Sequence, residues 1–261
     1  MEAVITASGR EVRPPIRAAD SPSLSVLAGS VAAVGLGLAM FLLIAEDLLD
    51  GGGLIPHDQT VLAWFIGART DALVQLAEIV SAFGSFVGLG ICSMLIAAAL
   101  RLRGRPLVLA IAPLIALLVA GLASTGAKDL FGRERPPMAV HAVSVTLAAF
   151  PSGHATDTAA CLLAGSLVLA LTVATRRWEQ GLYLATGLAL ATLVGVSRLV
   201  LGVHWLSDVV AGWALGSAIA VVVVMASWCE VTRSVGRRPT EPGQAYLHGT
   251  GEVGPGRPDD A

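Results

Sequence analysis

Long apolar segments dominate this chain of 261 residues, and their length limits what it can fold into. Each is about 20 residues long, enough for a helix to cross a hydrocarbon core about 30 Å thick. Backbone N–H and C=O groups find no water in that core, so a lipid-exposed segment that crosses it must be helical. The sequence therefore predicts an all-α integral membrane protein with six transmembrane helices, at roughly 24–45, 74–100, 107–127, 155–175, 181–200 and 207–229.

The segments that flank the predicted membrane domain, residues 24–230, have a different composition. Residues 1–23 carry six charged side chains, and the first apolar segment ends at Glu46 and Asp47 without a small-residue cleavage site. We therefore expect that segment to be a retained membrane helix rather than a signal peptide. Residues 231–261 are rich in glycine, proline and charge, which predicts a disordered tail.

The basic residues predict how the helices are oriented. Of the 17 Lys and Arg residues, all but Arg69, Lys128, Arg133, Arg135 and Arg198 fall on one side of the six-helix arrangement. The positive-inside rule places that side in the cytoplasm, together with both termini. We expect a multi-pass protein of the cell membrane, whose remaining loops are extracytoplasmic.

Composition also excludes some functions. The formal net charge is −2 and Lys128 is the only lysine, so there is no basic surface for nucleic acid. Cys92, Cys161 and Cys229 lie within or at the edge of predicted helices and show no pairing framework, so we expect reduced, structural thiols.

Three polar clusters interrupt the apolar segments. They are Lys128 with Arg135-Pro136, then Pro151-Ser152-Gly153-His154, then Ser197-Arg198 with His204 and Asp208. The first ends the third predicted helix, the second opens the fourth, and the last lies between the fifth and the sixth. The six-helix topology therefore places all three on the extracytoplasmic face.

The residue types in these clusters suit phosphoryl transfer. Lys128, Arg135 and Arg198 bring three positive charges to one face, and charge neutralisation is what that reaction mainly requires. Ser152 and Gly153 would offer backbone N–H groups at a helix N-terminus, where the helix dipole attracts anions. These five residues are the predicted phosphate-binding set.

The two histidines predict the catalytic groups. His204 and Asp208 are four residues apart, so Asp208 can hold one ring N–H and leave the other ring nitrogen free to attack. His204 is thus the predicted nucleophile, which forms a phosphohistidine. His154 is placed to protonate the leaving group and then to activate water.

The order and spacing of the clusters, K-x6-R-P, P-S-G-H and S-R-x5-H-x3-D, match a known signature. Over Lys128 to Asp208 the chain resembles the type 2 phosphatidic acid phosphatase superfamily, which assigns the same roles to the two histidines. The resemblance implies a membrane phosphatase that acts on a lipid phosphate or diphosphate without metal or cofactor. Family members act on phosphatidate, phosphatidylglycerophosphate or polyprenyl diphosphate, and the outward face ranks polyprenyl diphosphate first. The expected partners are the substrate and membrane lipids, with no obligate protein partner.

Several alternatives remain open from the residues alone. Ser152 is a second candidate nucleophile, and His154, Asp157, His204 and Asp208 have the ligand types of a zinc site. A phosphotransferase, a non-catalytic lipid-phosphate binder or transporter, and a vanadate haloperoxidase are the rival functions.

Three further features have quieter interpretations. Arg133 is expected to extend to the membrane interface or to lipid headgroups. Asp157 is expected in the first turn of its helix, as a charge that favours the helix start or tunes His154. Residues 58–77 are expected to form an amphipathic helix in the interface.

Overall fold

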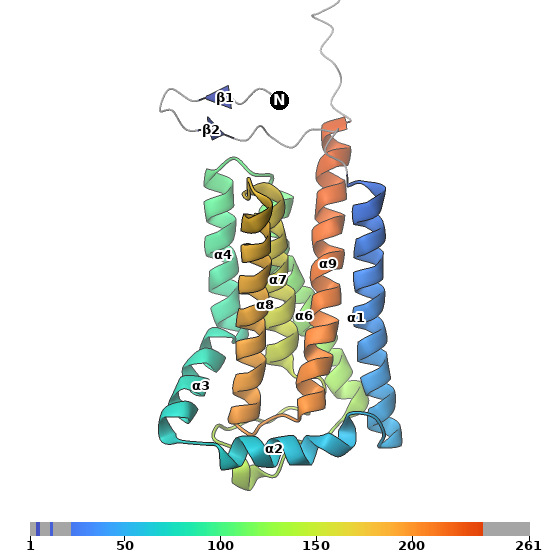
Figure 1. Ribbon diagram of the computed structural model, residues 1–261, viewed down its shortest axis with the longest axis vertical. Coiled ribbons are helices and arrows are strands. Elements are labelled where there is room, and N and C mark those ends of the chain that lie inside the picture. The colour runs from blue at the N-terminus through green and yellow to red at the C-terminus, as the bar shows by residue number, and fades with distance from the viewer. Residues whose placement is uncertain (1–3, 6–10, 13–21, 237–261) are drawn as a thin grey trace, which may run out of the picture.

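The computed structural model describes residues 4–5, 11–12 and 22–236, and almost all of them are helical (Figure 1). The helices are α1 (Leu24–Asp50), α2 (Asp58–Gly67), α3 (Asp71–Phe83), α4 (Phe86–Leu102), α5 (Leu107–Ala110), α6 (Ala112–Phe131), α7 (Gly153–Thr172), α8 (Arg177–Val200) and α9 (Leu206–Gly236), with 3-10 turns η2 (Ile55–His57) and η3 (Met138–Val140). Strands β1 (Val4–Ile5) and β2 (Glu11–Val12) form an antiparallel pair in which Val4 faces Val12. The all-α membrane domain is confirmed.

Five helices are long and apolar enough to cross a membrane, namely α1, α6, α7, α8 and α9. A sixth candidate is the pair α3 and α4, which meet at an angle of 54°. The prediction of one continuous helix over residues 74–100 is therefore wrong. The Ser85 side chain accepts a hydrogen bond from the Gly88 N–H at 3.1 Å, which caps α4 and starts a new helix there.

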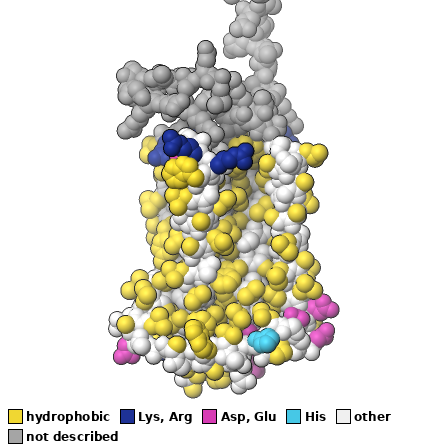
Figure 2. Space-filling view, in the orientation of Figure 1, with side chains coloured by type: hydrophobic (Ala, Val, Ile, Leu, Met, Phe, Trp, Pro, Cys, Tyr) yellow, Lys and Arg dark blue, Asp and Glu magenta, His cyan; other side chains and the backbone are white. Residues whose placement is uncertain are grey.

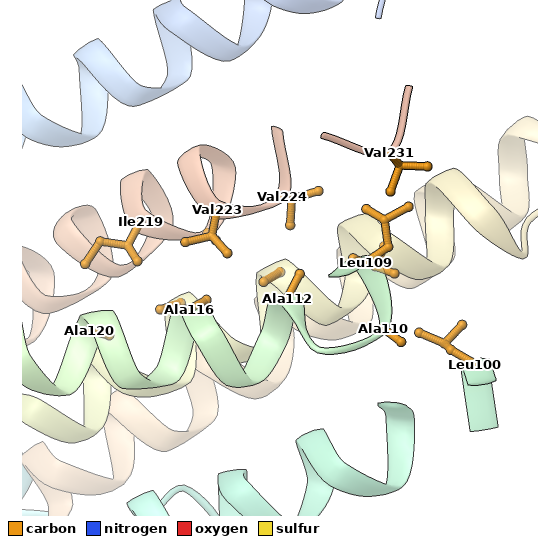
Figure 3. Packing of buried hydrophobic residues seen from close by; sticks show 14 of the residues in the cluster. Leu100, Leu109, Ala110, Ala112, Ala116, Ala120, Ile219, Val223, Val224 and Val231 are labelled. Carbon is orange, nitrogen blue, oxygen red and sulfur yellow. The ribbon is translucent and has the colours of Figure 1, made fainter. Parts of the chain in front are cut away.

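Helix α7 forms the centre of the bundle, surrounded by α6, α8 and α9 (Figure 1). Small side chains allow this close packing, which is how helices associate where lipid removes the hydrophobic driving force. On α6, Ala112, Ala116 and Ala120 recur every four residues on one face. Figure 3 shows this face against Ile219 and Val223 of α9.

Helix α2 lies across the lower end of the bundle in Figure 1, close to horizontal. The expected interfacial helix over residues 58–77 is thus divided. It breaks because Thr70 caps α3 by accepting the Leu73 N–H at 3.2 Å. Trp64 is exposed, but Asp58 is buried, so the start of α2 belongs to the protein interior.

Charge separates the two ends of the molecule. On the face that Figure 2 draws, arginine side chains gather at the upper end, where α4 ends and α8 begins, and Asp, Glu and His side chains lie at the lower end. An apolar band lies between them. The middle of the bundle therefore has the surface that lipid requires.

Helix α9 continues to Gly236, past the predicted domain boundary at residue 230. Residues 237–261, which hold the rest of the predicted C-terminal tail, lie outside the described residues, as does most of the predicted N-terminal tail.

Packing between α7 and α9 predicts a sensitive position at Gly216. A Cβ atom there would lie 2.3 Å from the Thr156 carbonyl oxygen and 2.8 Å from the Ala159 Cβ. We expect Gly216→Ala to destabilise the protein by about 1–3 kcal/mol and to lower the unfolding midpoint by about 2–4 °C per kcal/mol. Thermal unfolding in detergent checks this.

The matched control is Gly181→Ala on α8, where an added Cβ meets nothing within 4 Å. It should leave the midpoint unchanged or raise it slightly, because alanine favours the helix. Equal midpoints for the two variants would contradict the packing argument.

Candidate active site

The three sequence clusters meet in one cavity at the lower end of the bundle. The cavity has a volume of about 700 Å³, and its lining includes six of the predicted site residues, Lys128, Arg135, Gly153, His154, Arg198 and His204. They come from the end of α6, the loop after it, the start of α7, the end of α8 and the loop before α9. The other two predicted residues, Ser152 and Asp208, are fully buried.

His204 lies two residues before α9 and is held from both ring nitrogens. Its Nδ1 is 3.3 Å from Asp208 Oδ2, and its Nε2 is 3.2 Å from Arg135 Nη1. With a proton on Nδ1 for Asp208, Nε2 carries the lone pair and faces a phosphate-binding cation. Burial, and then the nearby Arg135, lower the pKa of His204 well below its usual value. The imidazole is therefore neutral at pH 7, as a nucleophile must be.

Asp208 is held in turn by Arg133. Arg133 Nη1 donates to Asp208 Oδ1 at 2.5 Å, and its Nη2 donates to Asp58 Oδ2 at 2.6 Å. Asp58 also accepts the Ser207 N–H at 2.9 Å and the Ser207 hydroxyl at 2.5 Å, which ties α2 to the start of α9. The expectation that Arg133 extends to headgroups is wrong, because its side chain is only 10% exposed and bridges two buried carboxylates.

Sequence reasoning missed this network because its parts are distant in the chain. Asp58 and Arg133 are 75 residues apart, and nothing in the local pattern pairs them. A usable signal was the position of Arg133 inside the first cluster, two residues before Arg135.

The cations of the first cluster donate hydrogen bonds to backbone carbonyls in the loops that precede α7 and α9. Lys128 Nζ donates to the carbonyls of Ala148, at 3.0 Å, and Pro151. Arg135 donates to Leu147 through Nε and to Val203 through Nη1, both at 2.6 Å. Backbone carbonyls thus fix both cations at the cavity.

Arg198 is positioned by a residue that the sequence did not indicate. Its Nη1 donates to the Ser81 hydroxyl of α3 at 2.5 Å, while its Nε is buried without a hydrogen-bond partner. Ser81 is 117 residues away in the chain, so its role follows only from the fold.

At the start of α7, one of the two backbone N–H groups that were predicted to bind phosphate has another acceptor. The Ser152 N–H donates to the Asp208 backbone carbonyl at 3.0 Å, so it does not face the cavity as expected. Gly153 does line the cavity and lies in the first turn, where helix N–H groups lack an intrahelical acceptor. The Ser152 hydroxyl oxygen is buried and unpartnered, and Ser152 does not line the cavity.

Asp157 also lines the cavity, but it lies in the second turn of α7 and not in the first as expected. Its Oδ1 is buried and has no hydrogen-bond partner. Within the described ranges, no three His, Cys, Asp or Glu side chains are grouped so that they could hold a metal ion. Cys161 is buried beside Ser93, in agreement with a structural thiol.

Comparisons with known proteins show what this chain is similar to. A sequence model of the PAP2 superfamily matches residues 109–230, which hold all three clusters. Phosphatidylglycerophosphatase B of Bacillus subtilis is 37% identical over 118 residues, which are 42% of this chain and 55% of that protein. Decaprenylphosphoryl-5-phosphoribose phosphatase of Mycobacterium tuberculosis is 38% identical over 104 residues, 37% of this chain and 49% of that protein. Undecaprenyl-diphosphatase of Sulfolobus acidocaldarius is 39% identical over 75 residues, 29% of this chain and 32% of that protein.

The chain thus matches about half or less of the length of these curated relatives. A crystal structure described as a transmembrane PAP2 type phosphatidylglycerolphosphate phosphatase from Bacillus subtilis extends the match in fold. It aligns with a TM-score of 0.66 over 78% of this chain and 99% of that chain, at 20% identity. Through residues 109–230 this chain is thus similar to the PAP2 superfamily, and it shares the helical fold of that transmembrane structure.

Proposed function

We propose that this protein is a membrane phosphatase that hydrolyses a lipid phosphate monoester or diphosphate, through a phosphohistidine and without metal or cofactor. The observation that carries the proposal is a buried His204 held between Asp208 and Arg135 at the wall of a cation-lined cavity. The names of the relatives support this reaction class, since they are phosphatases of lipid or polyprenyl phosphates.

In the proposed reaction, Lys128, Arg135 and Arg198 hold the phosphate together with the Gly153 N–H. His204 Nε2 attacks phosphorus, and the bond from phosphorus to the leaving oxygen breaks as His154, which starts this step protonated, gives that oxygen its proton. His154 then takes a proton from water, which attacks phosphorus and breaks the P–N bond. Inorganic phosphate leaves and His204 is again neutral. Asp208 stabilises the ring while it carries the phosphoryl group.

The apolar part of the cavity supports a lipid substrate. Phe86 of α4 and Leu118 and Leu122 of α6 line it, and all three side chains are also exposed at the surface of the bundle, by 46%, 49% and 77%. A chain attached to a phosphate at His204 would leave the cavity along these side chains and enter the bilayer.

Removal of the nucleophile is the direct test. We expect His204→Ala to lower phosphate release from a panel of lipid phosphates by at least about 10³-fold, since the covalent route is lost. The assay uses purified protein in detergent with excess EDTA, because the mechanism needs no metal. His57→Ala, an exposed histidine at the same end, should keep its activity. An active His204→Ala enzyme would refute the mechanism.

Arg133 should act through Asp208 and not on substrate, since it does not line the cavity. We expect Arg133→Gln to lower kcat by about 10- to 100-fold, as for other groups that orient a catalytic residue, while KM stays within about threefold. Arg133→Lys keeps the charge but not the two-sided bridge, so its loss should be smaller. A raised KM with an unchanged kcat would mean that Arg133 binds substrate.

The proposed location of the site is the extracytoplasmic face, opposite the arginine-rich end of the bundle. In a variant without native cysteines, Met138→Cys should react with an impermeant thiol reagent in intact cells, because Met138 is exposed at the cavity end. Arg103→Cys, exposed at the other end, should react only after the membrane is opened. The reverse pattern would place catalysis in the cytoplasm.

A further inference from the structure

Asp157 is a buried carboxyl group that the proposed mechanism does not use. It is 8% exposed, lines the cavity, and has an Oδ1 that is buried without a hydrogen-bond partner. A buried polar atom left unpaired costs about 1–3 kcal/mol. The fold therefore bears a cost at this position that no hydrogen bond to Oδ1 within the described protein offsets.

Structural explanations for this carboxyl group do not account for its position. It lies in the second turn of α7, beyond the helix N–H groups that an acidic side chain can cap. Lys128 is attracted to it electrostatically, but the Lys128 ammonium donates to the carbonyls of Ala148 and Pro151. The carboxyl is thus neither a cap nor a required partner of the lysine.

The place of Asp157 along the cavity indicates what it could meet. Helix α7 begins at Gly153 beside the phosphate-binding cations, and Asp157 follows His154 by three residues, or about 4.5 Å along the axis. Leu118 and Leu122 line the cavity from earlier turns of α6, farther from Lys128. Asp157 therefore lies between the phosphate end and the apolar part, beside the atoms that join the reacting phosphate to the lipid.

We propose that Asp157 accepts a hydrogen bond from a hydroxyl group carried by the alcohol part of the substrate, next to the phosphate ester. This inference rests on the proposed function and names its substrate class: a lipid whose terminal phosphomonoester is borne by a polyol, such as glycerol or a pentose. A simple prenyl phosphate offers only CH₂ at that place. A diphosphate would put a second anionic phosphate beside the carboxylate. The position of Asp157 thus favours polyol phosphates as substrates over polyprenyl diphosphate, which the predicted outward face of the site ranks first.

Two substrates that differ only in one hydroxyl group measure the contribution of that group to kcat/KM. Wild-type protein is assayed on 1-oleoyl-glycerol 3-phosphate and on its 2-deoxy analogue, with a prenyl diphosphate as a third substrate. We expect kcat/KM to favour the hydroxyl compound over the deoxy compound by about tenfold or more, the size of a hydrogen bond to a charged group. In Asp157→Ala the ratio should fall to within about twofold of unity, with little change for the deoxy compound. Asp157→Asn should improve the relative rate on the diphosphate.

Two controls separate recognition from folding. Asp129→Asn removes an exposed carboxyl of α6 that does not line the cavity, and it should keep the wild-type preference. Because the Asp157 Oδ1 has no protein partner, Asp157→Ala should unfold at the wild-type temperature or above it. A lower unfolding temperature would make Asp157 a structural residue and overturn the inference.

The outcomes distinguish this inference from the proposed function. Equal wild-type rates on the hydroxyl and deoxy compounds would overturn the role of Asp157 and leave the phosphatase intact. Equal losses on both compounds in Asp157→Ala would also overturn it, since the residue would then act on the chemistry in general. No phosphate release from any of the three substrates would refute the proposed function itself, and the inference with it.

Discussion

The rest of the site depends on the interactions of the Asp208 carboxylate. One of its oxygens accepts from the Trp205 N–H, at 2.9 Å, and contacts the His204 ring, and the other accepts from Arg133. The backbone carbonyl of the same residue accepts the Ser152 N–H at the start of α7. A single residue therefore aligns the candidate nucleophile, closes the turn before α9 and joins α9 to α7. Since Asp208 is fully buried, such a charge requires the guanidinium that Arg133 supplies.

Packing in the membrane supports this polar arrangement from a distance. Gly212 faces the Ser152 carbonyl and Gly216 faces the Thr156 carbonyl, so α7 and α9 approach closely just beyond the site. Helix α7 carries His154 and helix α9 carries Asp208. Contact between small residues thus fixes the separation of the two candidate catalytic elements, and side-chain bonds then set their orientation.

The sequence predicted those parts of the fold and site that rest on local spacing or on segment length. Apolar segments of membrane length located the helices, and the four-residue interval between His204 and Asp208 predicted their contact. The sequence prediction missed the break at Gly84 and Ser85. A hydropathy profile does not distinguish a serine that caps a helix from any other polar residue inside a membrane span. Arg133 with Asp58, and Arg198 with Ser81, were missed because each pair joins segments at least 75 residues apart. No periodicity carries information about such pairs.

Carbonyl groups around Lys128 and Arg135 have a consequence for the release of product. These cations already donate to Leu147, Ala148, Pro151 and Val203, so a phosphate that enters must share or displace existing acceptors. An anion held by cations with no other acceptor would bind tightly and leave slowly. Here the backbone carbonyls compete with phosphate for the same donors, and their hydrogen bonds can re-form when phosphate leaves. Lys128 and Arg135 are thus arranged to release phosphate as well as to bind it, which suits a site that must lose its product after each turnover.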